Sequence, residues 1–373
     1  MGLRRRPKRG VGKTMRVAIS TGGGDAPGLN AVIRAVVLSA HYRGWRCYGI
    51  QRGYEGLLSF NGVVPLGPAE VRGITHLGGT ILGTTNRGNP FRFITRDEHG
   101  HEMEIDRSDD LVAAFQASGF DALVSIGGDG SLQISHQLWC KGLPVVCVPK
   151  TIDNDVSGTQ RTFGFDSAVS TATEALDKVH STAESHDRVI VVELMGRYAG
   201  WIALYSGLSG SADVILLPEI PFDIEKVCEK IRAREAAGRR FSIVVVAEGA
   251  RPRSGEIELV ERRGVGTVDR LGGIASKVAR AIELRTGKET RTLVLGHLQR
   301  GGSPTTYDRL LALRFGGAAV RAIAEGAFGT MVGLNGPDIT RVPLAEVVGR
   351  AKNLPLDGDI IATARELGIS LGD

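Results

Sequence analysis

Short apolar segments rich in β-branched residues alternate along the chain with longer segments in which apolar positions follow a helical period. Several of the short segments are apolar throughout, which is typical of strands covered on both faces of a parallel sheet. This alternation predicts an α/β fold with doubly wound, mainly parallel sheets, and the number of strands suggests two such sheets. The predicted strands are 16–20, 46–50, 122–127, 145–149, 188–194, 214–218, 242–249 and 291–296, and the predicted helices are 28–42, 131–140, 165–183, 223–237, 270–286 and 306–325.

The loops that follow the predicted strands are rich in glycine and charged residues. Because ligands bind outside the carboxyl ends of the strands in open α/β sheets, these loops are where a binding site is expected. Successive strand ends share this character, so we expect them to converge on one site. They read STGGGDAPGLN (20–30), SIGGDGS (125–131), VPKTIDND (148–155), VELMGRYAG (192–200), VAEGA (246–250) and LGHLQRGGSP (295–304).

The chain of 373 residues has a formal net charge of +5, but this charge is unevenly distributed. Residues 1–14 hold six of the 46 basic residues and no acid, which leaves 40 basic against 41 acidic residues elsewhere. We therefore interpret 1–14 as a disordered basic tail on a nearly neutral body, and we expect no nucleic-acid partner. No apolar run approaches the ~18–20 residues of a membrane span, so no membrane partner is expected. The cysteines lack metal-ligand spacing, which predicts a cytoplasmic protein with reduced core thiols at Cys47, Cys140, Cys147 and Cys228.

Two glycine-rich loops are suited to contact with phosphate groups. The glycines at 22–24 let backbone N–H groups approach a phosphate, and the helix that begins near Gly28 adds its dipole. In GGDGS (127–131), the carboxylate of Asp129 would repel a polyphosphate unless a divalent cation intervened, so this residue points to bound Mg²⁺. Lipid kinases and nicotinamide-dinucleotide kinases carry similar stretches. The loops therefore predict a phosphoryl donor and leave its acceptor open.

The segment VPKTIDND (148–155) combines a cation with groups that handle protons. Its proline ends the strand, because proline fixes φ and disfavours helix in the preceding residue. Asp153 then lies near a strand end, close in sequence to the hydroxyl of Thr151 and the ammonium of Lys150. An alcohol loses its proton as it attacks phosphorus, and we interpret Asp153 as the general base that accepts this proton. Asp155 either assists or caps the turn.

Cationic side chains near the remaining strand ends predict an anionic group on the acceptor. Guanidinium groups bind phosphate through paired hydrogen bonds, so several of them at one end of the sheets imply a fixed phosphate. Glu248, in their midst, is suited to hydrogen bonds with sugar hydroxyls or to an ion pair with an arginine. The cations expected at this common end are Arg188, Arg197, Arg291, His297 and Arg300.

With these residues assembled, the chain resembles the 6-phosphofructokinase family from about Met15 to the 320s. The resemblance implies two similar domains with the active site in the cleft between them. Residues 15–164 with about 299–350 would bind the phosphoryl donor, and residues 165–298 with about 351–373 would bind fructose 6-phosphate. The motifs that carry the resemblance are GGGDAPGLNAVIRAVV (22–37), GGTILG (78–83), IGGDGS (126–131), PKTIDND (149–155), FGFDSA (163–168), ELMGRYAGW (193–201), LGHLQRGGSP (295–304) and YDR (307–309).

The resemblance also implies a role for each matching residue. Asp153 would deprotonate the 1-hydroxyl of fructose 6-phosphate, with Thr151 and Arg197 assisting, and Asp129 would hold Mg²⁺. The family forms its site across a subunit boundary, here in a homodimer or homotetramer, with Arg188 and Arg291 supplied by the neighbour. The nucleotide would contact Gly24, Arg87, Gly88, Gly128, Asp129, Gly130 and Ser131. The sugar phosphate would contact Thr151, Ile152, Asp153, Met195, Gly196, Arg197, Glu248, His297, Leu298, Gln299 and Arg300.

Gly130 and Lys150 point to different phosphoryl donors. ATP-using members of the family have glycine at the position of Gly130, where an aspartate would repel the α-phosphate. Pyrophosphate-using members have lysine at the position of Lys150, so the combination resembles a mixed group. We expect ATP, because a lysine can bind the terminal phosphate of either donor. Leu38 replaces an effector-site arginine one turn after Arg34, so regulation by ADP and phosphoenolpyruvate is not implied.

The sequence thus predicts transfer of a phosphoryl group from Mg-ATP to O1 of fructose 6-phosphate, a reaction of glycolysis. A pyrophosphate-dependent enzyme is the nearest alternative. A non-catalytic sugar-phosphate sensor is an alternative of another class. That sensor would be expected to have lost the metal or base carboxylate, yet Asp129 and Asp153 are both present.

Overall fold

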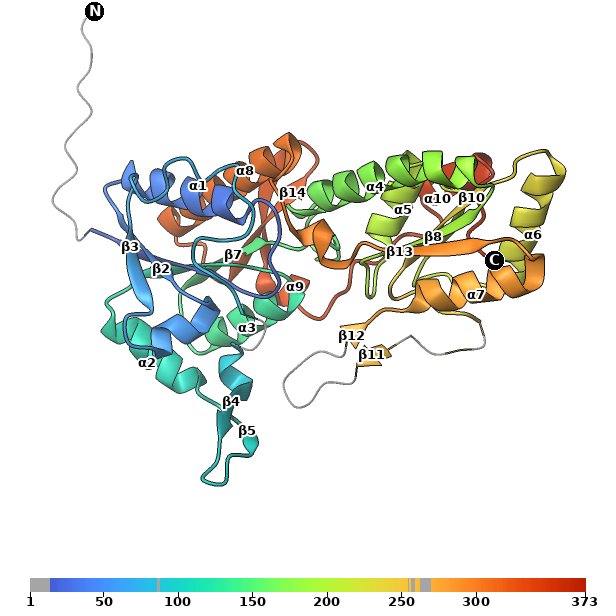
Figure 1. Ribbon diagram of the computed structural model, residues 1–373. Helices are drawn as coiled ribbons and strands as arrows, with labels where there is room; N and C mark the ends of the chain where they lie inside the picture. Colours follow the sequence, from blue (N-terminus) through green and yellow to red (C-terminus); the bar gives the residue numbers. More distant parts are fainter. Residues whose placement is uncertain (1–13, 86–87, 254, 256–258, 262–269) are drawn as a thin grey trace, which may run out of the picture.

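The computed structural model describes residues 14–85, 88–253, 255, 259–261 and 270–373. They form two lobes, each built around its own sheet, and the predicted α/β class with mainly parallel sheets is confirmed (Figure 1). Across these described ranges, no helix has both the length and the apolar composition needed to cross a membrane. All but the last residue of the predicted basic tail, 1–14, lies outside them.

The first lobe contains a seven-stranded sheet in the order β15-β14-β7-β6-β1-β2-β3. Neighbouring strands from β14 to β2 are parallel, and β15 and β3 join antiparallel at the two edges. Successive strand residues face opposite sides of the sheet, so Val17 belongs to one core and Ala18 to the other. The strands are β1 (Arg16–Thr21), β2 (Arg46–Ile50), β3 (Val63–Leu66), β6 (Ala122–Gly127), β7 (Val145–Pro149), β14 (Thr330–Asn335) and β15 (Asp338–Pro343).

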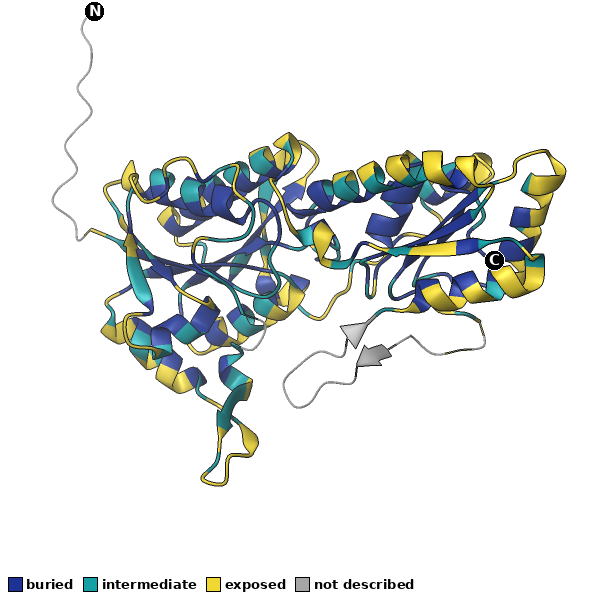
Figure 2. Cartoon of the chain, viewed as in Figure 1, coloured by how far each residue is buried: buried dark blue, intermediate teal, exposed yellow. Residues whose placement is uncertain are grey.

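Helices cover both faces of this sheet. The long helices α1 (Leu29–His41) and α8 (Thr306–Ala324) pack together on one face and bury an apolar core beneath them. Figure 2 shows the buried residues as dark blue stretches along the strands of the sheet and along the helices that cover it. A hairpin of β4 and β5 projects from the lobe (Figure 1). The remaining elements are α2 (Ser108–Ala117), α3 (Asp129–Cys140), α9 (Leu344–Val347), η1 (Gly53–Leu58), η2 (Pro90–Arg92), β4 (Phe93–Arg96) and β5 (Glu102–Ile105).

The second lobe contains a four-stranded parallel sheet in the order β13-β8-β10-β9. One of its cores includes residues of α4, α5 and α10, and the other includes residues of α6 and α7. The buried carboxylate of Glu193 accepts hydrogen bonds from the backbone N–H groups of Gly273 (3.2 Å) and Ala275 (3.0 Å), which stabilises the start of α7. The elements are β8 (Val189–Leu194), β9 (Val214–Leu216), β10 (Ser242–Ala247), β11 (Leu259–Glu261), β12 (Arg270–Leu271), β13 (Thr290–Val294), α4 (Phe165–Ser185), α5 (Trp201–Ser209), α6 (Ile224–Ala236), α7 (Ile274–Thr286), η3 (Gly296–Arg300) and α10 (Asp359–Glu366).

The chain returns to each lobe after first leaving it. After β13, helix α8 and strands β14 and β15 complete the first lobe, and α10 then packs into the core of the second lobe with Leu371. The segment that joins β15 to α10 passes the loop after β7. There Val156 forms an antiparallel bridge with Ala351.

Every strand and helix predicted from the sequence is present, and three strands have the predicted bounds, 46–50, 122–127 and 145–149. The sequence missed the helices α2, α5, α9 and α10, the edge strand β3, the hairpins β4–β5 and β14–β15, the short strands β11 and β12, and the 3₁₀ helices η1, η2 and η3. The prediction that all four cysteines are core thiols is wrong for Cys140. This residue is exposed because it is the last residue of α3 and lies at its solvent end.

Candidate functional site

The loops after β1, β6 and β7 lie next to one another because these strands are adjacent and parallel. The backbone N–H of Gly22 donates to the carbonyl of Ile126 (2.9 Å), and that of Lys150 donates to the carbonyl of Gly127 (2.8 Å). Helix α3 begins at Asp129, directly after β6, so its N-terminus is at the same edge of the sheet. The structure thus brings three of the predicted motifs together.

Two of the predicted glycines allow these loops to pack closely. A Cβ on Gly24 would lie 2.6 Å from Nη1 of Arg300, and a Cβ on Gly128 would lie 3.2 Å from the carbonyl oxygen of Lys150. A Cβ on Gly130 would meet no heavy atom of the described residues within 4 Å. Gly130 is exposed in the first turn of α3, so the space beside its backbone is open toward solvent.

Ser131 and Gly88 extend the same region. The Ser131 hydroxyl lies 2.8 Å from where a Cβ on Gly22 would stand, so the loop after β1 lies directly against the start of α3. A Cβ on Gly88 would lie 2.7 Å from Cγ2 of Thr85, whose backbone carbonyl accepts a hydrogen bond from Gly23 (3.2 Å). The predicted nucleotide contact Arg87 lies outside the described residues.

Lys150 is buried, and its ammonium points back into the loop after β1. Its Nζ donates a hydrogen bond to the carbonyl of Gly24. Burial, and then the charge of Arg300, lower the pKa of Lys150 to about 8. The acidic groups of Asp25 and Asp153 oppose this shift and favour the charged form. A buried cation at this edge favours an anionic ligand.

Asp153 has one carboxylate oxygen, Oδ1, that is buried and has no hydrogen-bond partner within the described part of the chain. Its backbone N–H donates to Oγ1 of Thr151 (3.1 Å), which helps to fix the turn. Burial, and then the negative charge of Asp155, raise the pKa of Asp153 to about 7. A positioned carboxylate with a pKa near neutrality is well suited to accept a proton from an alcohol.

Asp129 is exposed at the first turn of α3, with Asp155 near enough to affect its titration. Desolvation, and then the charge of Asp155, raise the pKa of Asp129, and desolvation also raises the pKa of Asp155. A divalent cation would relieve this repulsion. The described residues contain no cluster of three or more candidate metal ligands. This arrangement fits Mg²⁺, which binds through one or two carboxylates and keeps water and substrate phosphates as its other ligands.

The second lobe contributes the segments after β8 and β10. The backbone N–H of Met195 donates to Oε1 of Gln299 (3.3 Å), and Gln299 is fully buried. Gly196 has φ of 138°, a conformation that favours glycine. A Cβ on Gly249 would lie 2.0 Å from the carbonyl oxygen of Arg197, so the two segments are in direct contact. Through its hydrogen bond to the Met195 N–H, the buried Gln299 holds the backbone after β8 in place.

Arg300 connects the two lobes at the site. It lies at the end of η3, and its Nη1 donates to the backbone carbonyl of Asp25 (3.1 Å) in the loop after β1. Its charge opposes the upward pKa shifts of Asp153 and Glu248. For Glu248 the main cause of that shift is burial, followed by the charge of Glu193. The segments after β7 and β10 thus each place a carboxylate within electrostatic reach of the Arg300 guanidinium.

Two of the five predicted cations lie elsewhere in the chain's own structure. Arg188 precedes β8 and Arg291 is the second residue of β13, so both lie at amino ends of strands, opposite the edge that carries Arg300. The expectation that all five share one end is therefore wrong for these two. Both pair with Glu289, Arg188 through Nη2 at 2.9 Å. His297 is on η3 with Arg300 and is exposed, as is Leu298.

The sequence interpretation missed two residues that contact the site. Asp25 follows Gly24, and its negative charge favours the protonated form of Lys150 and so raises the pKa of that lysine. Its position in the GGGD motif could have identified it from the sequence. Lys352 donates from Nζ to Oδ1 of Asn154 (3.1 Å), although 198 positions separate the two residues. No local pattern around Lys352 indicates that contact.

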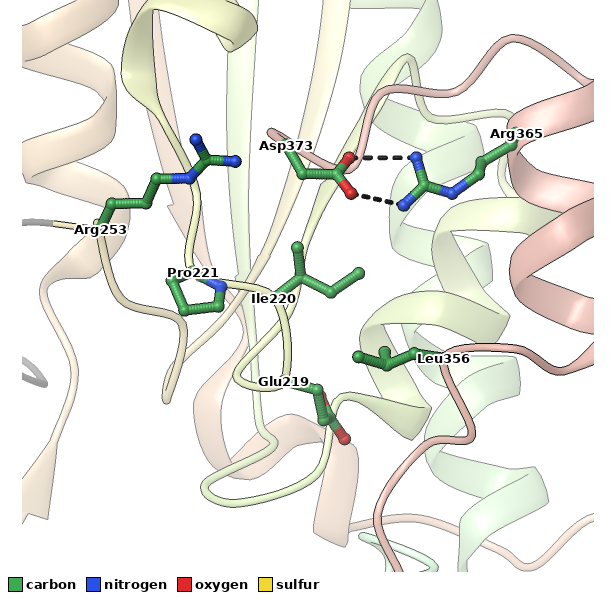
Figure 3. A pocket seen from close by; sticks show the side chains of 7 residues that line it. All are labelled: Glu219, Ile220, Pro221, Arg253, Leu356, Arg365 and Asp373. Atoms are coloured by element: carbon green, nitrogen blue, oxygen red, sulfur yellow. Dashed lines mark hydrogen bonds and ion pairs between the residues drawn. The ribbon is translucent and has the colours of Figure 1, made fainter.

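A separate pocket of about 560 Å³ lies beyond the end of β9, the outer edge strand of the second sheet (Figure 3). The ion pair of Arg365 and Asp373 stands at one side of it (Nη1–Oδ1, 3.1 Å). None of the predicted site residues that the structure describes lines this pocket, and the convergent strand ends are the stronger candidate. Its lining residues are Glu219, Ile220, Pro221, Arg253, Leu356, Arg365 and Asp373.

Residues 16–323 match the family model described as Phosphofructokinase. An ATP-dependent 6-phosphofructokinase of Chloroflexus aggregans is 53% identical over 362 residues, covering 97% of this chain and 99% of the relative. A pyrophosphate–fructose 6-phosphate 1-phosphotransferase of Amycolatopsis mediterranei is 50% identical over 347 residues, covering 92% and 97%. The structure of Pichia pastoris phosphofructokinase in the T-state is similar with a TM-score of 0.76 and 32% identity over 91% of this chain, which spans only 36% of the Pichia chain.

Proposed function

Because the chain belongs to the phosphofructokinase family, we propose that it transfers the terminal phosphoryl group of ATP to O1 of fructose 6-phosphate, giving fructose 1,6-bisphosphate and ADP. The observation that carries the proposal is Asp153, a carboxylate with a pKa raised to about 7 and one buried oxygen that finds no hydrogen-bond partner among the described residues. It lies beside a buried lysine and within reach of an arginine held at the junction of the lobes.

Asp153 acts as the general base. Its ionised carboxylate accepts the proton of the 1-hydroxyl as the oxygen attacks phosphorus. The oxygen of the new phosphate ester is therefore not left protonated and positively charged. Thr151 holds the turn by accepting the Asp153 backbone N–H (3.1 Å). Lys150 offers its buried positive charge to the transferring phosphoryl group.

The first lobe binds the donor. Gly24, Gly88, Gly128, Gly130 and Ser131 bring backbone close to the nucleotide phosphates, and Arg87 adds a cation. Asp129 would hold Mg²⁺, whose charge neutralises the donor phosphates. This assigns 15–164 with about 299–350 to the donor.

The second lobe binds the sugar phosphate, with residues 165–298 and about 351–373. Arg300, at the junction of the two lobes, binds the 6-phosphate together with His297. Glu248 accepts hydrogen bonds from sugar hydroxyls, and Arg197 stabilises charge on the transferring group. Met195 and Gly196 contact the sugar through their backbone. The buried side chains of Ile152 and Gln299 support the loops, and exposed Leu298 completes the rim.

The site is completed by a second copy of the chain in a homodimer or homotetramer. Arg188 and Arg291 lie at the opposite edge of their own sheet, where both are partly or fully exposed and pair with Glu289. From that edge they reach the 6-phosphate in the neighbouring subunit. The enzyme acts in the cytoplasm, where its glycolytic substrates occur.

Gly130 favours ATP over pyrophosphate, since the space beside it is open. Lys150 is compatible with either donor. The test is to measure initial rates with purified protein, Mg²⁺ and saturating fructose 6-phosphate, first with ATP and then with pyrophosphate. We expect the rate with ATP to be the larger. A dominant pyrophosphate rate would identify the pyrophosphate-dependent reaction instead, and no rate with either donor would favour a non-catalytic sensor.

A further inference from the structure

The segment of residues 351–354, here called the C-terminal strap, lies against the turn that contains Asp153. Ala351 forms an antiparallel bridge with Val156, and the backbone N–H of Lys352 donates to the carbonyl of Asp155 (3.0 Å). Asp155 and Val156, two and three positions after the proposed base, are thus bonded to a segment from the far end of the chain.

The strap is also attached to the second lobe. The indole Nε1 of Trp201, the first residue of α5, donates to the carbonyl of Lys352 (3.0 Å). The carboxylate of Glu219 accepts from the backbone N–H groups of Leu354 (3.2 Å) and Gly200 (3.0 Å). The strap therefore joins the turn of the first lobe to the start of α5.

The side chain of Lys352 enters the turn itself. Its Nζ donates to Oδ1 of Asn154 (3.1 Å) and to the carbonyl of Gln160 (2.7 Å), and it lies 5.2 Å from the ring centre of Trp201. Burial, and then the charge of Arg161, lower the pKa of Lys352 to about 7. A neutral amine still donates hydrogen bonds, so these contacts survive deprotonation.

Asn154 is the residue on which the turn depends. It has φ of 52°, a left-handed conformation that costs a non-glycine residue about 1 kcal/mol or more. Its side chain is buried, and Oδ1 also accepts the backbone N–H of Thr162 (3.1 Å). One amide oxygen held by two donors fixes this conformation, and with it the direction in which the preceding residue, Asp153, projects.

We propose that Lys352 is a positioning residue for the phosphoryl transfer, which holds Asn154 so that the Asp153 carboxylate is aligned with the acceptor hydroxyl. Lys352 acts through Asn154. The inference rests on the proposed function, and it adds a residue from the C-terminal strap that the motifs of the site do not contain.

The test compares Lys352→Met with a matched control, Lys178→Met, on an exposed face of α4. Lys352→Met keeps the apolar stem and removes every donor. Two hydrogen bonds are lost, each commonly worth a factor of roughly two to ten, so we expect kcat to fall about tenfold while KM for fructose 6-phosphate and ATP changes less than about twofold. Lys352→Arg, which can donate to the same two oxygens, should restore most of kcat. K178M should match the wild type.

A double-mutant cycle shows whether Lys352 acts through Asn154. Asn154→Gly keeps the left-handed backbone without strain but removes the amide, so N154G should lower kcat by about as much as K352M. The double variant should then be no slower than either single one. Circular dichroism and thermal melting establish whether each variant is folded. If K352M does not fold, the kcat of N154G tests whether the turn positions Asp153.

Wild-type kcat in folded K352M or N154G would overturn the inference, as would losses that multiply in the double variant. A change confined to melting temperature would also overturn it, because it would assign Lys352 to stability alone. If neither the wild type nor K178M phosphorylates fructose 6-phosphate, the proposed function fails instead, and that outcome is distinct from a failure of Lys352.

Discussion

Replacing Asp153 by asparagine should produce an enzyme that is nearly inactive and yet more stable than the wild type at alkaline pH. The substitution removes the proton acceptor, and general-base catalysis typically contributes a factor of about 10² to 10⁴. Its stability effect follows from the pKa. Burial and the negative charge of Asp155 raise the pKa of this carboxyl above its ordinary value, so keeping it ionised in the fold lowers the free energy of unfolding.

The destabilisation caused by the ionised Asp153 depends on pH. A raised carboxyl pKa destabilises the fold where the group is ionised, so the cost is absent near pH 4, grows as pH rises and is complete above about pH 7. D153N should therefore melt at a higher temperature than the wild type at pH 8. Near pH 4 the two should melt alike.

The assay combines steady-state kinetics with thermal melting at both pH values. Binding of fructose 6-phosphate should survive in D153N, since only the base is removed. Asp177→Asn, on an exposed position of α4, is the control and should change neither kcat nor melting temperature. Wild-type kcat in D153N, or a loss confined to substrate affinity, would refute the role of Asp153. An equal or lower melting temperature at pH 8 would refute the electrostatic cost.

Three further predictions follow from the site. Gly130→Asp places a carboxylate beside the donor, so the rate with ATP should fall at least about a hundredfold while the rate with pyrophosphate is retained. Gly130→Ala should keep ATP activity, and equal losses with both donors in Gly130→Asp would contradict the assignment. Arg291→Ala and D153N should each be inactive alone. When the two variants are dissociated and mixed, about half of the dimers should be mixed and each should contain one intact site, so about a quarter of wild-type activity should return. No recovery would place Arg291 outside the neighbour's site. The kcat/KM profile should fall below about pH 7 as Asp153 becomes protonated, and a flat profile from pH 5.5 to 8 would exclude that base.

The parts of the fold that the sequence predicts well are those with a strong local pattern. The strands β2, β6 and β7 are short, apolar and bounded by glycine, proline or charge, and their bounds follow directly. Helix α5 is apolar on nearly every side because it is buried, so it lacks the amphipathic period by which helices are found. The hairpin of β14 and β15 follows a helix and depends on pairing with β7, far away in the sequence.

The candidate site divides in the same way. The motif residues Asp129, Lys150 and Asp153 follow adjacent strands, so their convergence can be predicted from strand order alone. The placement of Arg188 and Arg291 could not be predicted by proximity to a strand, because an amino end and a carboxyl end lie at opposite edges of a parallel sheet. Lys352 was beyond reach for another reason, since its contact with Asn154 exists only once the chain has crossed between the lobes.

Everything proposed for this chain requires that loops from both lobes form one phosphoryl-transfer site. The most direct measurement is ³¹P NMR of the purified protein incubated with ATP, Mg²⁺ and fructose 6-phosphate. We expect one new phosphate ester on carbon 1 of the sugar for each ADP formed. Release of inorganic phosphate without a new ester, or an ester on a different carbon, would contradict this expectation.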